Sequence, residues 1–584
     1  MGGGYLTLFK KLYKIKKQHQ KEKQIYQETI KVFPQLKYPN LETCPDYSES
    51  LRYKFHLSYM LGEVLIKADK TWHKGGGFKL KNNIKKVNKE FQIFREIFKE
   101  FDQINSSVLK GLIDNKQLFL KEFPRIKNIL KIHQDYKAIL DNIFHNFNYF
   151  IQNFDLIEEW LLSDDFKERY KKENHPYPSL LDPKKLNDKN EEINYNNIPA
   201  ELAWEMNLPL PENYDFVFVW HGNIGSIAMN LFCLLSDIKM CLLDTKDNYI
   251  FTMSNLLQNI PFIPTLNNNV FGVDCYGEKY EKIFYLFQKQ YNILYIARDP
   301  ISIIKSRLNH PNGILFNNIT EDMKNITYFN SDFKDLFPKM YYGWCGMEKP
   351  KIQEIESYLW NYSLDLSYFI LKKYIKKIIF LNFSYMYSKY SFDIFVDLCN
   401  LFNYTPPLKK YKLLFEKRIL KDRGLLHLPV KININNYTIF IYSYYDYILD
   451  IKNVSGYTDI KNDIFKGDKL SILEDILVLA DKNTKYKIFK NDEKSIKFRN
   501  YIIKYIRALD LYVYNINKNL ITEEQILEYM KNNVKLLQKI KIMINENQNL
   551  IKTYNPEYLN TWTYYQEFEK MCKELDDDIQ EKDL

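Results

Sequence analysis

The sequence contains no uninterrupted run of about 18 apolar residues, so no segment is expected to cross a membrane as a helix. The amino terminus, MGGGYLTLFKKLYKIKKQHQKEKQ, also lacks the continuous apolar stretch of a secretory signal peptide. Cysteine is scarce: 7 residues are scattered along 584 positions, and no two of them form a CxxC pair. We therefore expect a protein of the reducing cytoplasm, without a disulfide framework or a structural zinc site.

Several catalytic signatures are missing as well. The chain has neither the HExxH motif of zinc proteases nor the GxSxG turn of serine hydrolases. Asp244 and Asp247 do not have the DxD spacing that metal-dependent glycosyltransferases favour. His56 and His73 have no cysteine between them, so they do not indicate a zinc site. We therefore expect no metal-ligand set in this protein.

The composition is that of a folded chain, with 46% hydrophobic and 27% charged residues. A prior of roughly 150 residues per domain predicts about three or four structural units. The 83 Lys and Arg exceed the 73 Asp and Glu, which gives a net charge of +10. This modest excess suits anionic ligands or an anionic membrane face. Without a recognised nucleic-acid-binding fold, it does not favour DNA or RNA as a partner.

The expected organisation begins with a helical region over residues 1–170. Within it, residues 5–33 form a basic amphipathic segment that either lies on anionic lipid or packs as a solvated helix on its own domain. Helical spacing of apolar residues predicts a helix over 51–70, and the glycines at 75–77 break it. Residues 171–214, rich in Pro and Asn, are expected to be a linker or long loop.

The second part of the chain has a different pattern. Short apolar runs alternate with helical patterns over 215–430, which is typical of βαβ units and a parallel sheet. Residues 431–584 contain a strand-like patch, NNYTIFIYSYYDYI, and then read as mostly helical. The expected fold class is therefore α/β, with a parallel-sheet core between helical amino- and carboxyl-terminal regions.

Two segments of this core are candidates for a phosphate site. DFVFVWHGNIGS (215–226) reads as a strand, a glycine-containing turn and the start of a helix. Such a turn directs backbone N–H groups and a helix amino terminus at an anion, although a βα turn without ligand has the same pattern. The candidate cradle consists of Gly222, Asn223, Ile224, Gly225 and Ser226.

The second segment is YNILYIARDPISIIKSRLNH (291–310). A buried strand ends before Arg298, and Pro300 suits the first turn of a helix. Ser306 lies about two helical turns later, so Arg298 and Ser306 could together hold one phosphate. The alternative is a structural pair of Arg298 with Asp299 and a solvated Ser306.

The pattern strand-R-[DN]-P-x(5)-S-helix resembles the 3′-phosphate-binding motif of sulfotransferases. The turn at 222–226 stands where that family has its 5′-phosphate loop, and 376–404 resembles the family's late strand and helix. This resemblance covers about 190 residues and implies a sulfotransferase-like, P-loop-type parallel sheet that binds a 3′-phosphonucleotide donor. It also suggests that Arg423 and Gly424 lie over the donor, although a solvated basic loop is the alternative.

The resemblance has one notable departure. The lysine that sulfotransferases usually carry in the 5′ loop is replaced here by Asn223. His221, the ionisable residue of this turn, is therefore the candidate catalytic residue, as a general base or as a stabiliser of the leaving phosphate. Ordinary sulfuryl transfer is less well matched by this loop than nucleotide binding is.

The block YMLGEVLIKADKTWHKGGGFKL and the whole-chain character resemble Campylobacter capsular-polysaccharide transferases that attach O-methyl phosphoramidate. That resemblance implies a 3′-phosphorylated CDP-type donor as co-substrate and capsular polysaccharide, or its lipid-linked precursor, as acceptor. It also implies a cytoplasmic enzyme that works at the inner face of the membrane. From its position and size, the region 431–584 is expected to shape acceptor choice. The alternatives are a PAPS-dependent carbohydrate sulfotransferase, a capsule glycosyltransferase and a non-enzymatic capsule assembly factor.

Overall fold

The computed structural model divides the chain into two compact units, Met1–Leu180 and Leu181–Leu584. The structure describes residues 5–39, 44, 47–71, 76–100, 106–220, 222–243, 245–258, 261–267, 278–287, 289–311, 324–329, 333, 336–343, 346–359, 374–418 and 423–583. The boundary between the units falls inside the range 171–214, where the sequence favours a linker.

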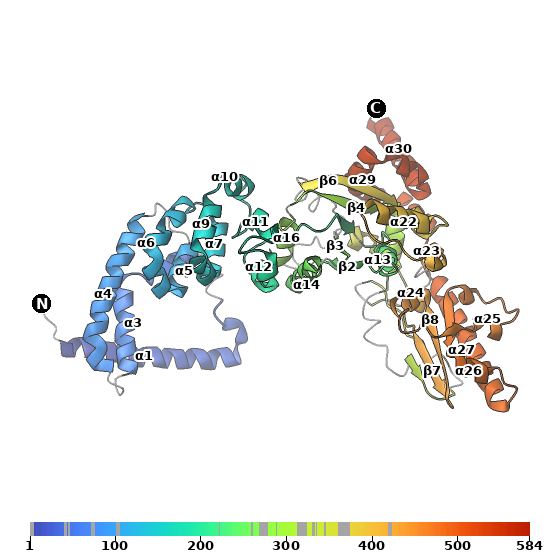
Figure 1. The fold of residues 1–584 in the computed structure, drawn as a ribbon, viewed down its shortest axis with the longest axis horizontal. Helices are drawn as coiled ribbons and strands as arrows, with labels where there is room; N and C mark the ends of the chain where they lie inside the picture. Colours follow the sequence, from blue (N-terminus) through green and yellow to red (C-terminus); the bar gives the residue numbers. More distant parts are fainter. Residues whose placement is uncertain are drawn as a thin grey trace. The chain divides into compact units, whose positions relative to one another are not determined.

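The first unit is built from helices, as the sequence predicts for residues 1–170 (Figure 1). Its α-helices are α1 (Tyr5–Val32), α2 (Tyr47–Tyr53), α3 (Leu57–Lys70), α4 (Gly76–Glu100), α5 (Ser106–Asp114), α6 (Lys116–Ile132), α7 (Lys137–His145), α8 (Phe147–Gln152), α9 (Phe154–Leu162) and α10 (Asp164–Phe166). The helix expected over 51–70 is divided into α2 and α3. Helix α4 begins at Gly76, so two glycines of the predicted break, Gly76 and Gly77, lie in its first turn. Fully buried phenylalanines, among them Phe119 and Phe150, fill the core.

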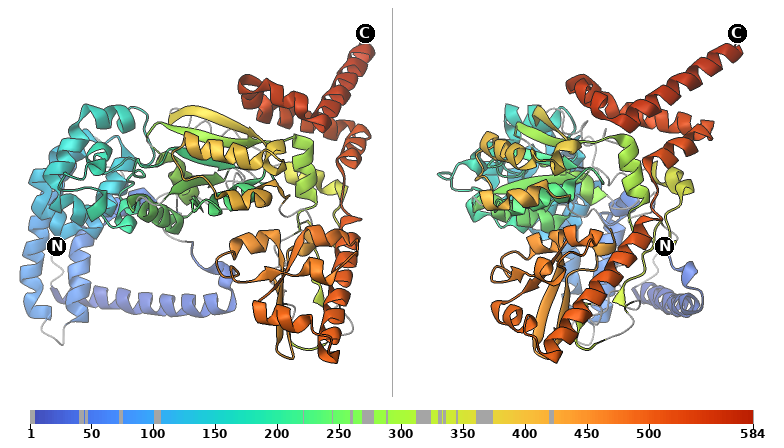
Figure 2. Two further views of the ribbon diagram at one scale, coloured as in Figure 1. Left: turned by 45° about the vertical axis from the view of Figure 1, so that its right-hand side comes forward. Right: turned by 90° about the vertical axis from the view of Figure 1, so that its right-hand side faces the viewer.

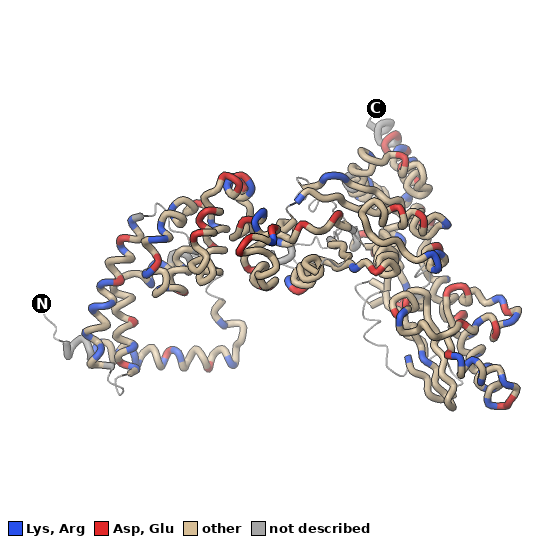
Figure 3. The backbone as a smooth tube through the Cα atoms, viewed as in Figure 1, with Lys and Arg blue, Asp and Glu red and all other residues tan. Residues whose placement is uncertain are grey.

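Helix α1 forms as predicted, and most of its length is exposed to solvent. Its sequence contains eight lysines and two glutamates, and Lys16 pairs with Asp69 of α3 at 2.5 Å. Figure 3 shows Lys and Arg interspersed with Asp and Glu along the helices of this unit. Tyr13 and Ile15 are more than half exposed. Among the described residues, no helix is both long and apolar enough to cross a membrane.

The second unit is a mixed α/β structure, and its described residues form two sheets. The first sheet is parallel and contains β1 (Phe216–Trp220), β2 (Lys239–Leu242), β3 (Phe262–Asn267), β4 (Tyr291–Ala297) and β6 (Ile375–Asn382), in the order β2-β3-β1-β4-β6. Both β1 and β4 are near-continuous apolar runs because helices cover the two faces of such a sheet. Phe218, Leu294 and Ile296 share one buried cluster with α13 (Ser226–Leu234) and α22 (Ser391–Leu401).

The second sheet was not expected, because the sequence indicated one strand-like patch and then a mostly helical region from residue 431. It has the order β5-β7-β8-β10-β9 and contains β5 (Asn325–Ile326), β7 (Val430–Ile434), β8 (Tyr437–Ser443), β9 (Thr458–Asp459) and β10 (Ile476–Ala480). Asn435 and Asn436 join β7 to β8 with positive φ angles of 51° and 64°, the geometry of a tight hairpin turn. The strand-like patch that begins with this turn therefore becomes β8 and a short helix.

The long helix α27 (Glu493–Asn517) packs on this second sheet (Figure 2). Ile439, Ile441 and Val478 of the sheet are fully buried in one cluster with Tyr505 and Leu509 of α27. Three further helices end the chain, α28 (Glu523–Lys531), α29 (Val534–Tyr554) and α30 (Thr563–Asp583). The remaining α-helices of the unit are α11 (Pro183–Asn187), α12 (Ala200–Glu205), α14 (Lys246–Leu257), α16 (Glu278–Tyr285), α17 (Pro300–Leu308), α20 (Ile355–Leu359), α23 (Lys412–Glu416), α24 (Tyr444–Leu449), α25 (Lys461–Ile464) and α26 (Lys482–Ile488).

Each unit contains a buried histidine that should make its stability depend on pH. His133 and His427 are both 1% exposed, and burial lowers the pKa of each from 6.5 to about 4. Between these pH values the unfolded chain binds a proton that the folded chain does not, so stability falls as pH falls. We expect each histidine to cost about 2 kcal/mol at pH 5 relative to pH 7.

Denaturant unfolding at both pH values tests this expectation. His133→Gln and His427→Gln should each flatten the pH dependence, whereas replacing the exposed His19 should leave it unchanged. An equal pH dependence in all four proteins would contradict the assignment.

Candidate functional site

The order of the parallel sheet creates a switch point between β1 and β4. The chain leaves β1 towards β2 at one edge of the sheet, whereas it leaves β4 towards β6 at the other edge. Connections that diverge in this way leave a crevice at the carboxyl ends of the two adjacent strands, where open α/β sheets bind ligands. The candidate phosphate residues follow these two strand ends. The turn 222–226 comes after β1, which ends at Trp220, and Arg298 comes directly after β4, which ends at Ala297.

The turn after β1 has the backbone conformation that a close approach of an anion requires. Helix α13 begins at Ser226, as predicted, and Gly225 before it has a φ of +104°. A Cβ at Gly225 would lie 3.0 Å from the ring of Phe383. Asn223 is also left-handed, with a φ of +70°, and the buried side chain of Ile224 anchors the turn in the core. Gly222 and Ser226 are half-buried. His221 lies outside the described residues.

Arg298 connects the turns that follow β1, β4 and β6. Its Nη1 donates to the backbone carbonyl of Asn223, and its Nη2 donates to Ser306 Oγ at 2.9 Å. The guanidinium also lies 4.1 Å from the ring centroid of Phe383, which directly follows β6. The spacing of Arg298 and Ser306 therefore does bring their side chains together. A cation, a hydroxyl and a helix amino terminus meet here, which is a suitable combination for a phosphate.

In the alternative interpretation, Asp299 is the structural partner of Arg298. The structure gives Asp299 a different role. Its Oδ1 caps α17 by accepting from the backbone N–H groups of Ile301 at 2.9 Å and Ser302 at 3.4 Å. Its Oδ2 accepts from the N–H groups of Tyr564 at 3.2 Å and Tyr565 at 3.1 Å. Burial raises the pKa of this carboxyl, and the four N–H contacts oppose that shift.

Ser306 is half-buried and hydrogen-bonded, so the alternative of a freely solvated serine is also wrong. Phe383 is the contact residue that sequence reasoning missed. Its position after a late strand is a weak signal, because the residues it contacts lie far away along the chain. Only the pairing of β4 with β6 brings Phe383 beneath Arg298.

The segment of Arg423 and Gly424 has a packing role in this structure. Both residues belong to the short 3₁₀ helix Arg423–Leu425, and this helix contacts α27. A Cβ at Gly424 would lie 2.8 Å from Val513 Cγ2 of α27, so the close approach of the two helices explains the glycine. The side chain of Arg423 lies outside the described part of the structure. A role of this segment over a nucleotide stays a prediction.

Among the described residues, no group of three His, Cys, Asp or Glu side chains is placed to hold a metal ion. The charge that the candidate site offers to an anion comes instead from Arg298 and the amino terminus of α13. This arrangement can bind phosphate groups through N–H donors, a guanidinium and a hydroxyl.

Comparisons with known proteins give two matches over parts of the chain. Residues 3–93 match a family described as "Domain of unknown function (DUF8374)", and residues 380–575 match one described as "Protein of unknown function (DUF2972)". No curated protein and no solved structure matches the chain. The second match includes Phe383, helices α28 and α29, and the first part of α30. Arg298 and the turn after β1 lie outside both matches.

Proposed function

We propose that this protein transfers O-methyl phosphoramidate from a 3′-phosphorylated CDP-type donor to a hydroxyl of capsular polysaccharide. The observation that carries the donor site is the hydrogen bond of Arg298 to Ser306, beside the glycine turn at the switch point of the parallel sheet. The strand order β2-β3-β1-β4-β6 supports a parallel α/β core for this site, and its sulfotransferase-like character rests on the sequence motifs. The transferred group and the acceptor rest on the sequence resemblance.

In the proposed complex, backbone N–H groups of the turn 222–226 and the α13 amino terminus hold the 5′ phosphates. Arg298 and Ser306 hold the 3′ phosphate, with Phe383 supporting the guanidinium plane. Through these contacts, hydrogen-bond donors in fixed positions bind the negatively charged phosphates of the nucleotide. They also orient the nucleotide as the leaving group.

The chemical step is an in-line displacement at phosphorus. The sugar hydroxyl oxygen forms a bond to the phosphorus of the methyl phosphoramidyl group, and the bond from that phosphorus to the nucleotide phosphate oxygen breaks. Cytidine 3′,5′-bisphosphate leaves with the bonding electrons, and the hydroxyl proton passes to a general base. His221 is the candidate base in this proposal.

Thermal unfolding with three nucleotides tests the donor site. A ligand at 100 times its dissociation constant adds about 2.7 kcal/mol to the stability of the folded protein. We expect cytidine 3′,5′-bisphosphate to stabilise the protein more than cytidine 5′-monophosphate, and more than adenosine 3′,5′-bisphosphate. A preference for the adenosine compound would contradict phosphoramidate transfer and favour sulfuryl transfer. Stabilisation by neither bisphosphate would overturn the nucleotide site.

A further inference from the structure

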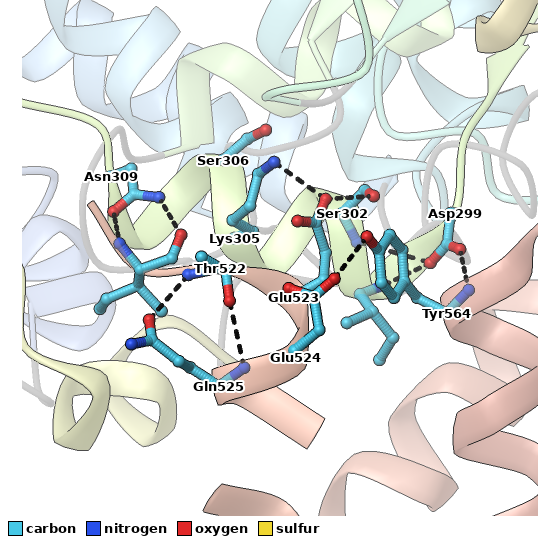
Figure 4. Close-up of polar contacts among 12 residues, drawn as sticks. Asp299, Ser302, Lys305, Ser306, Asn309, Thr522, Glu523, Glu524, Gln525 and Tyr564 are labelled. Atoms are coloured by element: carbon cyan, nitrogen blue, oxygen red, sulfur yellow. Dashed lines mark hydrogen bonds and ion pairs between the residues drawn. The ribbon is translucent and has the colours of Figure 1, made fainter. Parts of the chain in front are cut away.

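Helix α17, which carries Ser306, is attached to the carboxyl-terminal helices at its amino end. The carboxylate of Asp299 lies between the first turns of α17 and α30, and it accepts N–H hydrogen bonds from both (Figure 4). Because a helix amino terminus carries partial positive charge, one carboxylate here stabilises two helices at once. Asp299 is 8% exposed, so these backbone donors replace the water that it loses.

Two more contacts hold the rest of α17. Glu523, at the start of α28, accepts from Ser302 Oγ at 2.8 Å and from Lys305 Nζ at 2.9 Å (Figure 4). Asn309 follows α17 and exchanges two hydrogen bonds with the backbone of Ile521, at 2.7 and 2.9 Å. Glu523 is 8% exposed and Asn309 is 6% exposed, so both contacts are buried.

The three attachments of α17 involve residues close in sequence to Arg298 and Ser306, which are the candidate phosphate-site residues. Arg298 immediately precedes Asp299, and Ser306 immediately follows Lys305. A shift of α17 against α28 or α30 would therefore move the guanidinium and the hydroxyl away from their positions. A misplacement of about 1 Å can lower the rate of a reaction that depends on the bound geometry by about a hundredfold.

We infer that α28 and α30 form a brace that positions Arg298 and Ser306 for the 3′ phosphate, with Asp299 as the central positioning residue. This inference rests on the proposed function, since it concerns the same donor site. It assigns the end of the chain a part in donor binding, besides the acceptor choice suggested by the sequence. Removal of 430–584 is accordingly expected to abolish recognition of the 3′ phosphate.

The test uses Asp299→Asn in the full chain. Asparagine caps a helix about as well as aspartate does, so Oδ1 can still serve α17. Its amide NH₂, however, would face the N–H donors of Tyr564 and Tyr565. Calorimetry then gives the ratio of affinities for cytidine 3′,5′-bisphosphate and cytidine 5′-monophosphate. We expect this ratio to fall by about tenfold to a hundredfold, because the 3′ phosphate contacts depend on the position of α17.

Asp481→Asn is the matched control. Asp481 caps α26 by accepting from Thr484 N at 2.7 Å, and it serves the start of that one helix. Its replacement should leave the affinity ratio unchanged. Glu523→Gln is the second variant, should Asp299→Asn not fold; it keeps an acceptor for Ser302 but removes the charge opposite Lys305, and it should lower the ratio as well.

The affinity ratio separates positioning from general loss of folded protein, because both nucleotides bind the same folded fraction. An unchanged ratio in Asp299→Asn, or in Glu523→Gln where only that variant folds, would overturn the brace while the proposed donor site stands. A wild-type protein without preference for the 3′ phosphate would overturn the proposed donor site itself, together with the brace that rests on it.

Discussion

Replacing Arg298 by alanine is expected to weaken binding of cytidine 3′,5′-bisphosphate by a hundredfold or more and to abolish turnover. The guanidinium holds the turn after β1 through Asn223 and contacts Ser306 on α17. A hydrogen bond to a charged group contributes about 1.5–3 kcal/mol, so the loss of two such bonds to the 3′ phosphate would reduce affinity by at least that factor. Calorimetry with the purified full chain measures the change directly.

Two variants make the result specific to Arg298. Arg298→Lys keeps the positive charge but loses the two-pronged geometry, so we expect an intermediate affinity. Arg307→Ala removes a similar charge from the last turn of α17 and should leave binding nearly unchanged. Undiminished binding and turnover in Arg298→Ala would contradict the proposed transferase. Normal capsule modification by this variant in cells would favour the assembly-factor alternative.

Replacing Gly225 by alanine is the second change with a large expected effect. Its φ of +104° is strained for any residue with a Cβ, at a cost of about 1–3 kcal/mol. The new Cβ would in addition lie 3.0 Å from two ring atoms of Phe383, the ring that supports Arg298. We therefore expect a lower melting temperature and at least a tenfold loss of affinity for cytidine 3′,5′-bisphosphate.

Gly467→Ala is the matched control for backbone strain. Gly467 has a φ of +87°, and a Cβ there would have no neighbouring atom within 4 Å. This variant should lose stability through strain but should bind the nucleotide as the wild type does. If the two alanine variants lost similar stability and both kept full affinity, the turn after β1 would not be the phosphate cradle.

The local elements of the candidate site were predictable because each depends on neighbouring residues. The apolar run 216–220 predicted β1, and Pro300 predicted the start of α17. The eight-residue interval from Arg298 to Ser306 predicted that their side chains could meet, and they form a hydrogen bond. Strand, turn and helix signals of this kind come from backbone preferences and from apolar periodicity, which the sequence displays directly.

Long-range contacts were not predictable in the same way. The sequence showed one strand-like patch after residue 430 but not the sheet that it joins, because the pairing of β7, β8 and β10 depends on burial against α27. Phe383 reaches Arg298 only through the pairing of β4 with β6. The close approach of Gly424 to Val513 of α27 is a further contact that the sequence did not indicate.

The sequence by itself determined the α/β class of the second part of the chain, the helices of the first part and the residues that are candidates for a phosphate site. Only the tertiary structure decided where those residues meet and what holds them there. The contacts of Asp299 with Tyr564 and Tyr565 cross more than 260 residues of chain. Such contacts depend on the packing of whole helices and leave no local sequence pattern. Asp299 would cap α17 in the same way with or without α30 beside it, so the residues around it do not indicate the second helix.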